Sequence, residues 1–479
     1  MNESLKNKAA KGMFWAVGER VLTQGTLFVI SIVLARLLTP TEYGVLSILL
    51  VFTNLADVLV TNGLGESLVR QQNVSKQDYS TVFICGLLLS LVLYVVLFFA
   101  SPLISGFYGM ESISTYLKVL ALRIPFSSLN AIQKAYVAKN FLFKKQFSAT
   151  FFASLGSGLV AIVLAYQGAG VYALIAQQLL TVILTSIMLY IAVKWFPGFH
   201  FSRKSLFEVV PTGFQFCGAS LVNALYSEGR SLLIGKVYSS ADLAYFNRGN
   251  QFPSLIVSNL NTPISNVMLP VMAEVNDDGK KLKAITQKSM QLAAFVVFPL
   301  MAILALCGAP LVRLLLTEKW LPCVPYLQAA CIFYLFQPLQ TMNWQALKAA
   351  GEGGLCFKLE LIKKIIAFVL LGVSIPFGVM AISVSSVISG FISMLVNMGP
   401  NKRILDYGIF EQGMDMLKPL FSTLVASLAA VALSMLPVND YVLLALQVVI
   451  PVVVYLLVSK LVRSEGFVVL VGFLSAKKD

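Results

Sequence analysis

The chain alternates long apolar stretches with short polar segments along its whole length. A helix needs about 20 predominantly apolar residues to cross the hydrocarbon core of a bilayer. Windows of this kind predict an all-α polytopic membrane protein with fourteen transmembrane helices. The predicted spans are 14–37, 43–64, 81–101, 115–138, 147–166, 170–193, 207–234, 243–271, 287–312, 324–347, 359–376, 379–399, 417–436 and 441–461.

The basic residues between these spans alternate from one connection to the next. The N-terminus, the connections after even-numbered spans and the C-terminal tail carry most of the lysines and arginines. Cytoplasmic loops carry such an excess of Lys and Arg. The pattern predicts an even number of spans and both termini in the cytoplasm, and it places the protein in the inner (cytoplasmic) membrane. The opposite connections hold only Arg36, Lys236, Arg313 and Lys319.

A short segment that follows the first span recurs after the seventh span. Register and charge order agree between the copies, which both come directly after a first helix. Six spans separate them, so both copies have the same orientation, as in a parallel repeat. The matching pairs are Arg36 and Lys236, Thr39 and Ser239, and Glu42 and Asp242.

The repeat predicts two parallel six-helix lobes around a central cavity, followed by two extra helices. The N-terminal lobe is expected at residues 1–200 and the C-terminal lobe at 201–405. Residues 406–479 then form spans 13 and 14 and a cytoplasmic tail. Two lobes that rock about a central site are the mechanism that this arrangement favours.

Composition agrees with a membrane protein. Hydrophobic residues make up 58% of the chain, charged residues 12%, and the mean hydropathy is +0.81, whereas soluble domains are about one-quarter charged. The net charge of +14 follows mainly from the basic loops. Binding to nucleic acid, the usual explanation of a basic protein, is therefore not expected.

Charged residues inside the predicted spans are the main functional signal. A charge at the centre of the bilayer costs about 2.5–3.5 kcal/mol on insertion scales, so such residues usually face a wet cavity or a partner. The basic residues outnumber the acidic ones, which predicts an interior that attracts an anion. The basic residues are Arg20, Lys118, Arg123, Lys134, Arg230 and Arg248, and the acidic ones are Glu19, Asp57 and Glu228.

Polar residues also form stripes along spans 1, 2, 4, 7 and 8 at helical spacing. Such stripes line a cavity or hydrogen-bond neighbouring helices, and the pattern leaves both open. We expect Arg20, Arg123, Arg230 and Arg248 to bind the cargo. The amide side chains expected beside them are Gln24, Asn54, Asn223, Gln251 and Asn261. The acids Glu19, Asp57 and Glu228 are expected to couple an ion or to pair with the arginines.

Signals for catalysis, metals or cofactors are absent from the sequence. The chain has one histidine, His200, and one histidine cannot build a metal site. A Walker-like fragment, Gly229 to Lys236, has five residues between its glycines where four are needed, and Val237 replaces the hydroxyl residue that would bind magnesium. We therefore expect no enzyme activity, no metal and no cofactor.

Several segments carry a family resemblance in chain order. They are Ala35-Arg-Leu-Leu-Thr-Pro-Thr-Glu-Tyr-Gly44, Asn62-Gly-Leu-Gly-Glu-Ser-Leu-Val-Arg70, Gly170-Val-Tyr-Ala-Leu-Ile-Ala-Gln-Gln178, Leu232-Leu-Ile-Gly-Lys236 and Pro310-Leu-Val-Arg-Leu-Leu-Leu316. With them the chain resembles Wzx-type polysaccharide flippases of the multidrug/oligosaccharidyl-lipid/polysaccharide exporter superfamily, in the branch that exports O-antigen lipopolysaccharide, colanic-acid exopolysaccharide and teichuronic acid.

The resemblance implies a cationic central cavity and a cargo of undecaprenyl-pyrophosphate-linked oligosaccharide. The cargo would move from the cytoplasmic to the outer leaflet of the bilayer by alternating access. A polysaccharide polymerase and a chain-length regulator are the partners that such a pathway implies. The resemblance also implies that spans 13 and 14 help to form a groove for the lipid tail.

Three other functions compete with this interpretation. One is a lipid II flippase, which the net basic charge of the predicted cavity does not exclude. A multidrug or cation antiporter of the same superfamily would need an acidic cavity, whereas the charges here are net basic. A membrane enzyme such as an O-antigen polymerase or ligase would need a large outward loop with catalytic groups, and the predicted outward loops are short. We therefore expect a flippase.

Overall fold

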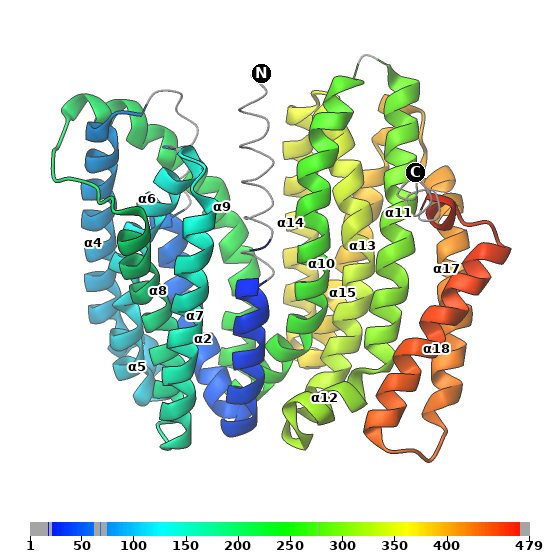
Figure 1. Ribbon diagram of the computed structural model, residues 1–479, viewed down its shortest axis with the longest axis horizontal. Helices are drawn as coiled ribbons and strands as arrows, with labels where there is room; N and C mark the ends of the chain where they lie inside the picture. Colours follow the sequence, from blue (N-terminus) through cyan, green and yellow to red (C-terminus); the bar gives the residue numbers. More distant parts are fainter. Residues whose placement is uncertain (1–17, 19–21, 62–67, 69–73, 277, 470–479) are drawn as a thin grey trace. The chain divides into compact units, whose positions relative to one another are not determined.

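The structure is a computed structural model that describes residues 18, 22–61, 68, 74–276 and 278–469. For residues 207–219, 222, 223, 262, 263 and 266 it describes the backbone only. All regular elements in these ranges are helices (Figure 1), so the all-α prediction is confirmed for this part of the chain.

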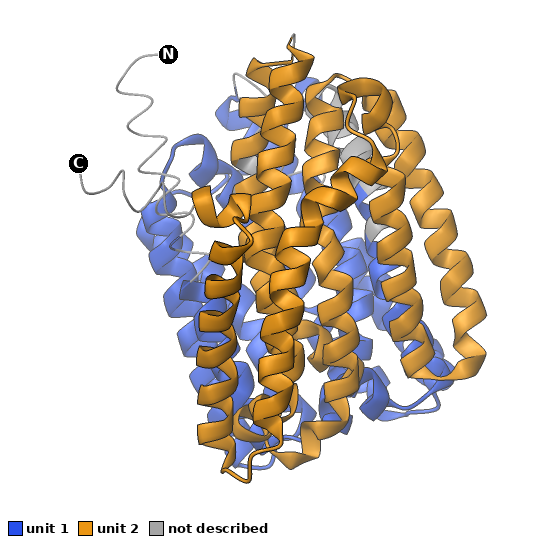
Figure 2. Cartoon of the chain, turned by 90° about the vertical axis from the view of Figure 1, so that its right-hand side faces the viewer, with its two compact units in different colours: residues 1–244 blue, residues 245–479 orange. Residues whose placement is uncertain are grey.

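The chain divides into two compact units, residues 1–244 and 245–479 (Figure 2). The sequence repeat predicts boundaries after residues 200 and 405. Those boundaries separate the two copies of the repeat, which need not coincide with compact units of the fold. They therefore stay a prediction.

Unit 1 is built from helices. They are the helix Leu22–Leu37, α2 (Pro40–Thr61), α4 (Lys76–Tyr108), α5 (Ser112–Ala121), α6 (Arg123–Lys139), α7 (Phe143–Tyr166), α8 (Val171–Val193) and α9 (Arg203–Val237). The span predicted at 115–138 is interrupted at Leu122, where α5 ends and α6 begins. Pro125 lies in the first turn of α6, where a missing N–H costs no helical hydrogen bond.

Small residues bring the helices of unit 1 close together. A Cβ on Gly158 of α7 would overlap the side chain of Ile30, so the glycine lets the helix Leu22–Leu37 approach. The hydroxyl groups of Ser157 and Thr181 lie 2.7 Å apart and join α7 to α8. Small residues and hydroxyl pairs of this kind are typical of helix contacts in membranes.

Unit 2 is also helical. Its helices are α10 (Ser240–Glu274), whose first turn belongs to unit 1, α11 (Gly279–Leu306), α12 (Gly308–Leu316), α13 (Val324–Ala349), α14 (Gly353–Ser374), α15 (Val379–Met398), α16 (Asn401–Leu405), α17 (Ile409–Ser434) and α18 (Asp440–Leu461). Short 3₁₀ turns cover Glu318–Cys323 and Ile375–Phe377.

Methionine fills much of the core of unit 2. The buried cluster between α10, α11, α13, α15 and α17 holds Met272, Met290, Met342, Met394, Met398 and Met416. Methionine is unbranched and flexible, so it fits the irregular gaps where several helices cross.

The outward faces of several helices are apolar. Val92, Val96 and Phe99 on α4 are exposed, as are Leu424 and Leu428 on α17. Among the described residues, eight helices are long and apolar enough to cross a membrane by length and composition. The chain is therefore a multi-pass membrane protein, since apolar surfaces of this extent are stable against lipid and not against water.

The two copies of the sequence repeat form the same local structure. Before α2, the backbone N–H of Thr39 donates to Glu42 at 2.7 Å, and the Thr39 hydroxyl accepts from the N–H of Glu42 at 3.3 Å. Before α10, Ser239 and Asp242 repeat this exchange at 3.2 and 3.1 Å. Both segments are reciprocal helix caps, so the echo in the sequence corresponds to one repeated structural motif.

Candidate functional site

An ion pair on two helices of unit 1 lies at the centre of its candidate site. Nη2 of Arg123 lies 2.8 Å from Oδ2 of Asp57, and the two side chains are 13% and 15% exposed. Arg123 is the first residue of α6, where the helix dipole disfavours a cation. Asp57 on α2 offsets this cost, so the break at Leu122 and the crossing of α2 together determine where the guanidinium lies.

The same arginine reaches a third helix. Its Nη1 donates to Oε1 of Gln178 on α8 at 3.4 Å. Nε of Arg123 and Oδ1 of Asp57 are buried, and neither has a hydrogen-bond partner within the described ranges. Such groups are costly in a low-dielectric interior, so this site retains one donor and one acceptor for a polar ligand or water.

A second polar contact links α2 to α9. Nδ2 of Asn54 donates to Oε1 of Glu228 at 3.1 Å. Asn54 precedes Asp57 by about one helical turn, so both side chains lie on one face of α2. This face of α2 therefore offers the Asp57 carboxylate to Arg123 and the Asn54 amide to the carboxylate of Glu228.

Arg230 contacts a tyrosine on its own helix. Its Nη2 donates to the hydroxyl of Tyr226 at 3.1 Å. The guanidinium carbon lies 5.1 Å from the centre of the Tyr226 ring, within reach of a cation–π interaction. One turn of α9 thus holds the arginine through both the hydroxyl and the ring.

Arg248 of unit 2 is buried, with 4% of its surface exposed. Its Nη1 donates to Oε1 of Gln251 at 2.6 Å, and its guanidinium carbon lies 5.1 Å from the centre of the Trp320 ring. Gly249 allows this packing, because a Cβ there would lie 2.7 Å from the backbone nitrogen of Leu327. Helix packing within unit 2 therefore fixes the position of Arg248.

The structure describes the side chains of only some of the remaining predicted residues. Nδ2 of Asn261 lies 3.5 Å from Oε1 of Gln337, between α10 and α13. Oε1 of Gln24 is buried and has no hydrogen-bond partner among the described residues. Glu19 and Arg20 lie outside the described residues, and so does the side chain of Asn223.

Some side chains that contact the predicted ones were not themselves predicted from the sequence. Gln178 and Gln337 are amides inside apolar helices, and this polarity is a signal that could have found them. Tyr226 and Trp320 are aromatic residues in an aromatic-rich chain, and sequence offers no signal to separate them from the others. The described residues contain no group of three or more His, Cys, Asp or Glu side chains that could hold a metal ion.

Comparisons with known proteins agree with one another. The model of a family described as polysaccharide biosynthesis protein matches residues 33–325. The teichuronic acid biosynthesis protein TuaB of Bacillus subtilis is 25% identical over 68% of this chain and 68% of its own length. The succinoglycan biosynthesis transport protein ExoT of Rhizobium meliloti is 23% identical over 73% of this chain and 71% of its own length.

A solved structure shows the same fold. The lipid II flippase MurJ, in an inward closed conformation, superposes with a TM-score of 0.74 at 16% sequence identity. The superposition covers 94% of this chain and 98% of that one. The described helices therefore have the fold of a membrane transporter.

Proposed function

Because the chain belongs to the polysaccharide biosynthesis protein family, we propose that it is a flippase for a lipid-linked oligosaccharide. The cargo is an undecaprenyl-pyrophosphate-linked repeat unit of a surface polysaccharide, which the protein moves across the cytoplasmic membrane. It acts as a transporter and not as an enzyme. The names of the relatives, which include a polysaccharide transport protein and a lipid II flippase, support this proposal.

The observation that carries the proposal is the way the arginines are held. Tyr226 holds Arg230, and Gln251 and Trp320 hold Arg248. Contacts of this kind fix a guanidinium in place without removing its charge. A guanidinium binds phosphate oxygens through two parallel N–H bonds and stays charged at every relevant pH, which suits a pyrophosphate.

Arg123 would bind the cargo by exchanging the Asp57 carboxylate for a phosphate oxygen of the cargo. Asp57 occupies one edge of its guanidinium, and an incoming phosphate oxygen would compete with that carboxylate. The amides of Gln24, Asn54 and Asn261 would hydrogen-bond sugar hydroxyls, directly or through water. The prenyl chain would stay in the lipid, because a polar site offers it no gain.

The arrangement that we propose is the one the repeat predicts. Fourteen spans form two six-helix lobes and two extra helices, with both termini in the cytoplasm. Transport would proceed by alternating access. A polymerase and a chain-length regulator would receive the transported repeat units on the outer side.

Binding of purified protein to three ligands tests the function. The ligands are an undecaprenyl-pyrophosphate-linked oligosaccharide, undecaprenyl phosphate and a cationic dye. The variants Arg123→Ala, Arg230→Ala and Arg248→Ala are compared with Arg203→Ala, which removes an exposed arginine at the first residue of α9. We expect the wild type and the control to prefer the pyrophosphate-linked glycan and the other variants to lose that preference by roughly tenfold or more.

Other outcomes would contradict the proposal in distinct ways. Preference for the dye would favour a drug or cation antiporter. Preference for the glycan with unchanged affinity in all three variants would leave the flippase function standing and reject the residue assignment. Reconstituted vesicles that retain all labelled glycan in one leaflet would reject the flippase itself.

A further inference from the structure

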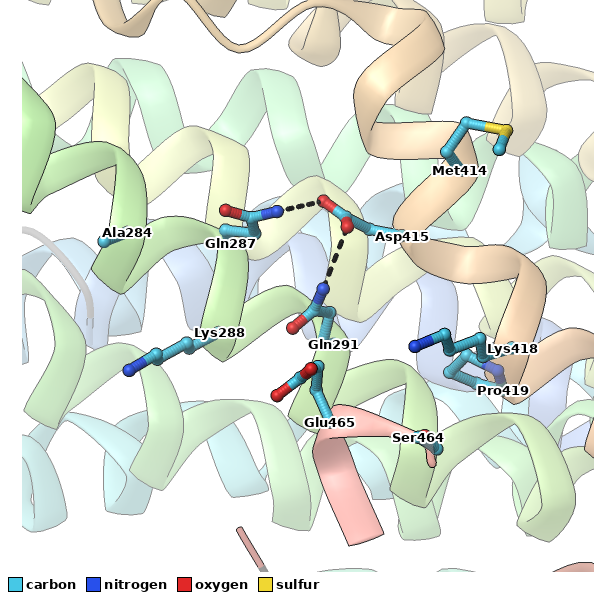
Figure 3. A pocket seen from close by; sticks show the side chains of 10 residues that line it. All are labelled: Ala284, Gln287, Lys288, Gln291, Met414, Asp415, Lys418, Pro419, Ser464 and Glu465. Atoms are coloured by element: carbon cyan, nitrogen blue, oxygen red, sulfur yellow. Dashed lines mark hydrogen bonds between the residues drawn. The ribbon is translucent and has the colours of Figure 1, made fainter. Parts of the chain in front are cut away.

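We propose that a polar cavity in unit 2 binds the phosphoethanolamine head group of a membrane phospholipid. The cavity has a volume of 330 Å³ and lies between α11, α17 and the segment that follows α18 (Figure 3). Small-molecule sites typically have about 300–1,000 Å³. The polar side chains that line it come from Gln287, Lys288, Gln291, Asp415, Lys418, Ser464 and Glu465.

Asp415 fixes the orientation of two amides on the cavity wall. Its carboxylate accepts from Nε2 of Gln287 at 2.8 Å and from Nε2 of Gln291 at 2.9 Å, as Figure 3 shows. The buried hydroxyl of Tyr407 donates to it at 2.6 Å. An ionised carboxylate can only accept, so the amide nitrogens must face it. The two amide oxygens are thus left as acceptors for a ligand.

A buried hydroxyl marks the cavity as a binding site. Ser464 lines it with only 1% of its surface exposed, and its hydroxyl has no hydrogen-bond partner among the described residues. Gln291 is also buried. Buried polar groups are almost always hydrogen-bonded in folded proteins. A ligand that accepts a hydrogen bond would complete the coordination of Ser464.

The charges around the cavity have both signs. Lys288 comes from α11 and Lys418 from α17, while Glu465 comes from the segment after α18. In Figure 3 the ammonium end of Lys418 extends away from the α17 backbone, toward the side where Gln291 lies. It also donates one hydrogen bond to the backbone carbonyl of Arg463 at 3.2 Å, and an ammonium group has three donors. A bare anion would meet Glu465, and a bare cation would meet the lysines. A zwitterion satisfies both, with its phosphate at Ser464 and the lysines and its amine at Glu465 and the amide oxygens.

The lengths of α11 and α17 allow the cavity to lie at the depth of the lipid head groups. Helix α11 has 28 residues and α17 has 26, which at 1.5 Å per residue gives about 42 and 39 Å. The hydrocarbon core is only about 30 Å thick. If each helix ends at the far boundary, about two turns of each project beyond the core at its start. Gln287 to Gln291 and Asp415 to Lys418 then fall at the near boundary.

Apolar side chains continue from the cavity along α17. Met414 lines the cavity and is 51% exposed, and Leu417, Phe421 and Leu424 are exposed further along the helix. Acyl chains could lie along this surface while the head group occupies the cavity. A membrane phospholipid therefore fits better than a free phosphate compound.

Native mass spectrometry and thermal unfolding of the full delipidated chain test this proposal. The protein is titrated with dioleoyl phosphatidylethanolamine, phosphatidylcholine or phosphatidylglycerol in mixed micelles, and separately with glycerophosphoethanolamine and inorganic phosphate. The variants are Glu465→Gln and Lys418→Met, both at exposed positions. Their matched controls are Glu352→Gln and Lys280→Met, at exposed positions outside the cavity.

We expect the wild type and both controls to bind phosphatidylethanolamine most tightly and to gain thermal stability from it. Phosphatidylcholine has no N–H donors, so it should bind more weakly. Each cavity variant should weaken phosphatidylethanolamine binding by roughly tenfold, because each removes one charged hydrogen bond. Equal binding of the three lipids, or unchanged binding in both variants, would overturn the proposal. Stabilisation by inorganic phosphate as strong as that by the lipid would reassign the cavity to a soluble anion.

Discussion

Arg123 and Asp57 form a nearly buried ion pair, with Nη2 and Oδ2 separated by 2.8 Å. Removing one partner of a buried pair leaves the other charge uncompensated, at a cost of about 3–5 kcal/mol. Since both side chains keep slight exposure, we expect Asp57→Asn to destabilise unit 1 toward the lower end of that range. Thermal unfolding of the wild type and the variant measures this cost.

The same substitution separates a structural role of Asp57 from competition with a ligand. If a phosphate must displace Asp57 from Arg123, then Asp57→Asn binds the pyrophosphate-linked glycan more tightly than the wild type although it is less stable. A purely structural role predicts weaker binding and lower stability together. Titration of both proteins with the glycan at a temperature where both are folded decides between them.

Asn54 is expected to hold α2 against α9 through Glu228. Asn54→Ala removes a hydrogen bond to a charged group, which typically contributes about 1.5–3 kcal/mol. Asn140→Ala is the matched control, because its amide donates to the backbone carbonyl of Tyr136 in the adjacent helix α6 at an exposed position. We expect the midpoint of thermal unfolding to fall for Asn54→Ala and to stay nearly constant for the control. Equal midpoints for both variants would show that the α2–α9 contact does not depend on this bond.

The charged residues of the candidate site stand out in the sequence, whereas their pairings do not. Arg123 is a candidate because charges are rare in apolar helices. Its pairing with Asp57 depends on how α2 crosses α6 and on the helix break at Leu122, and no one-dimensional pattern records a crossing. Trp320 lies in a 3₁₀ turn far along the chain from Arg248, and only the packing of unit 2 brings the two together.

For the helices, too, the sequence predicts one part better than another: the apolar middle is predicted well and the ends are not. Apolar windows locate the part of a helix inside the membrane, so the ninth span was predicted to begin at residue 287, whereas α11 begins at Gly279. The additional turns include Lys280, Lys281 and Lys283, which lower their mean hydropathy. Hydropathy cannot detect turns that project beyond the hydrocarbon core. The capping side chain of Asp278 marks the true beginning of this helix.

Gly44 is expected to be intolerant of any side chain. A Cβ at this position would overlap the backbone carbonyl of Ser240, so α2 and the start of α10 could not keep their contact. We expect Gly44→Ala to destabilise the protein by about 1–3 kcal/mol or more, as overpacking does. Gly106→Ala is the control, because a Cβ there meets nothing within 4 Å inside α4. Alanine should be neutral or slightly stabilising at that helical position. Similar unfolding midpoints for the two variants would contradict the close contact at Gly44.

Asp278 should make the first turn of α11 sensitive to acid. Hydrogen bonds from the backbone and side chain of Lys281 lower the pKa of its carboxyl group. A lowered pKa in the folded state means that the stabilisation is present above the ordinary pKa and is lost as the pH falls through the folded value. Hydrogen exchange at the amide of Lys281 should therefore accelerate, relative to its intrinsic rate, when the pH drops below that value. Asp278→Ala should show fast exchange at all pH values, and equal protection in both proteins would rule out the cap.

Chemical labelling of single cysteines should establish which loops share one side of the membrane. In a chain whose six native cysteines are replaced by alanine, Lys280→Cys and Lys402→Cys lie in basic connections, and Lys319→Cys lies in an opposite one. The excess of Lys and Arg on the cytoplasmic side predicts that a membrane-impermeant maleimide labels position 319 in intact cells. Positions 280 and 402 should react only after the membrane is opened. Labelling of 280 and 319 from the same side would mean that α11 does not cross the bilayer. Reversed labelling of all three positions would invert the predicted orientation while leaving the number of crossings between them unchanged.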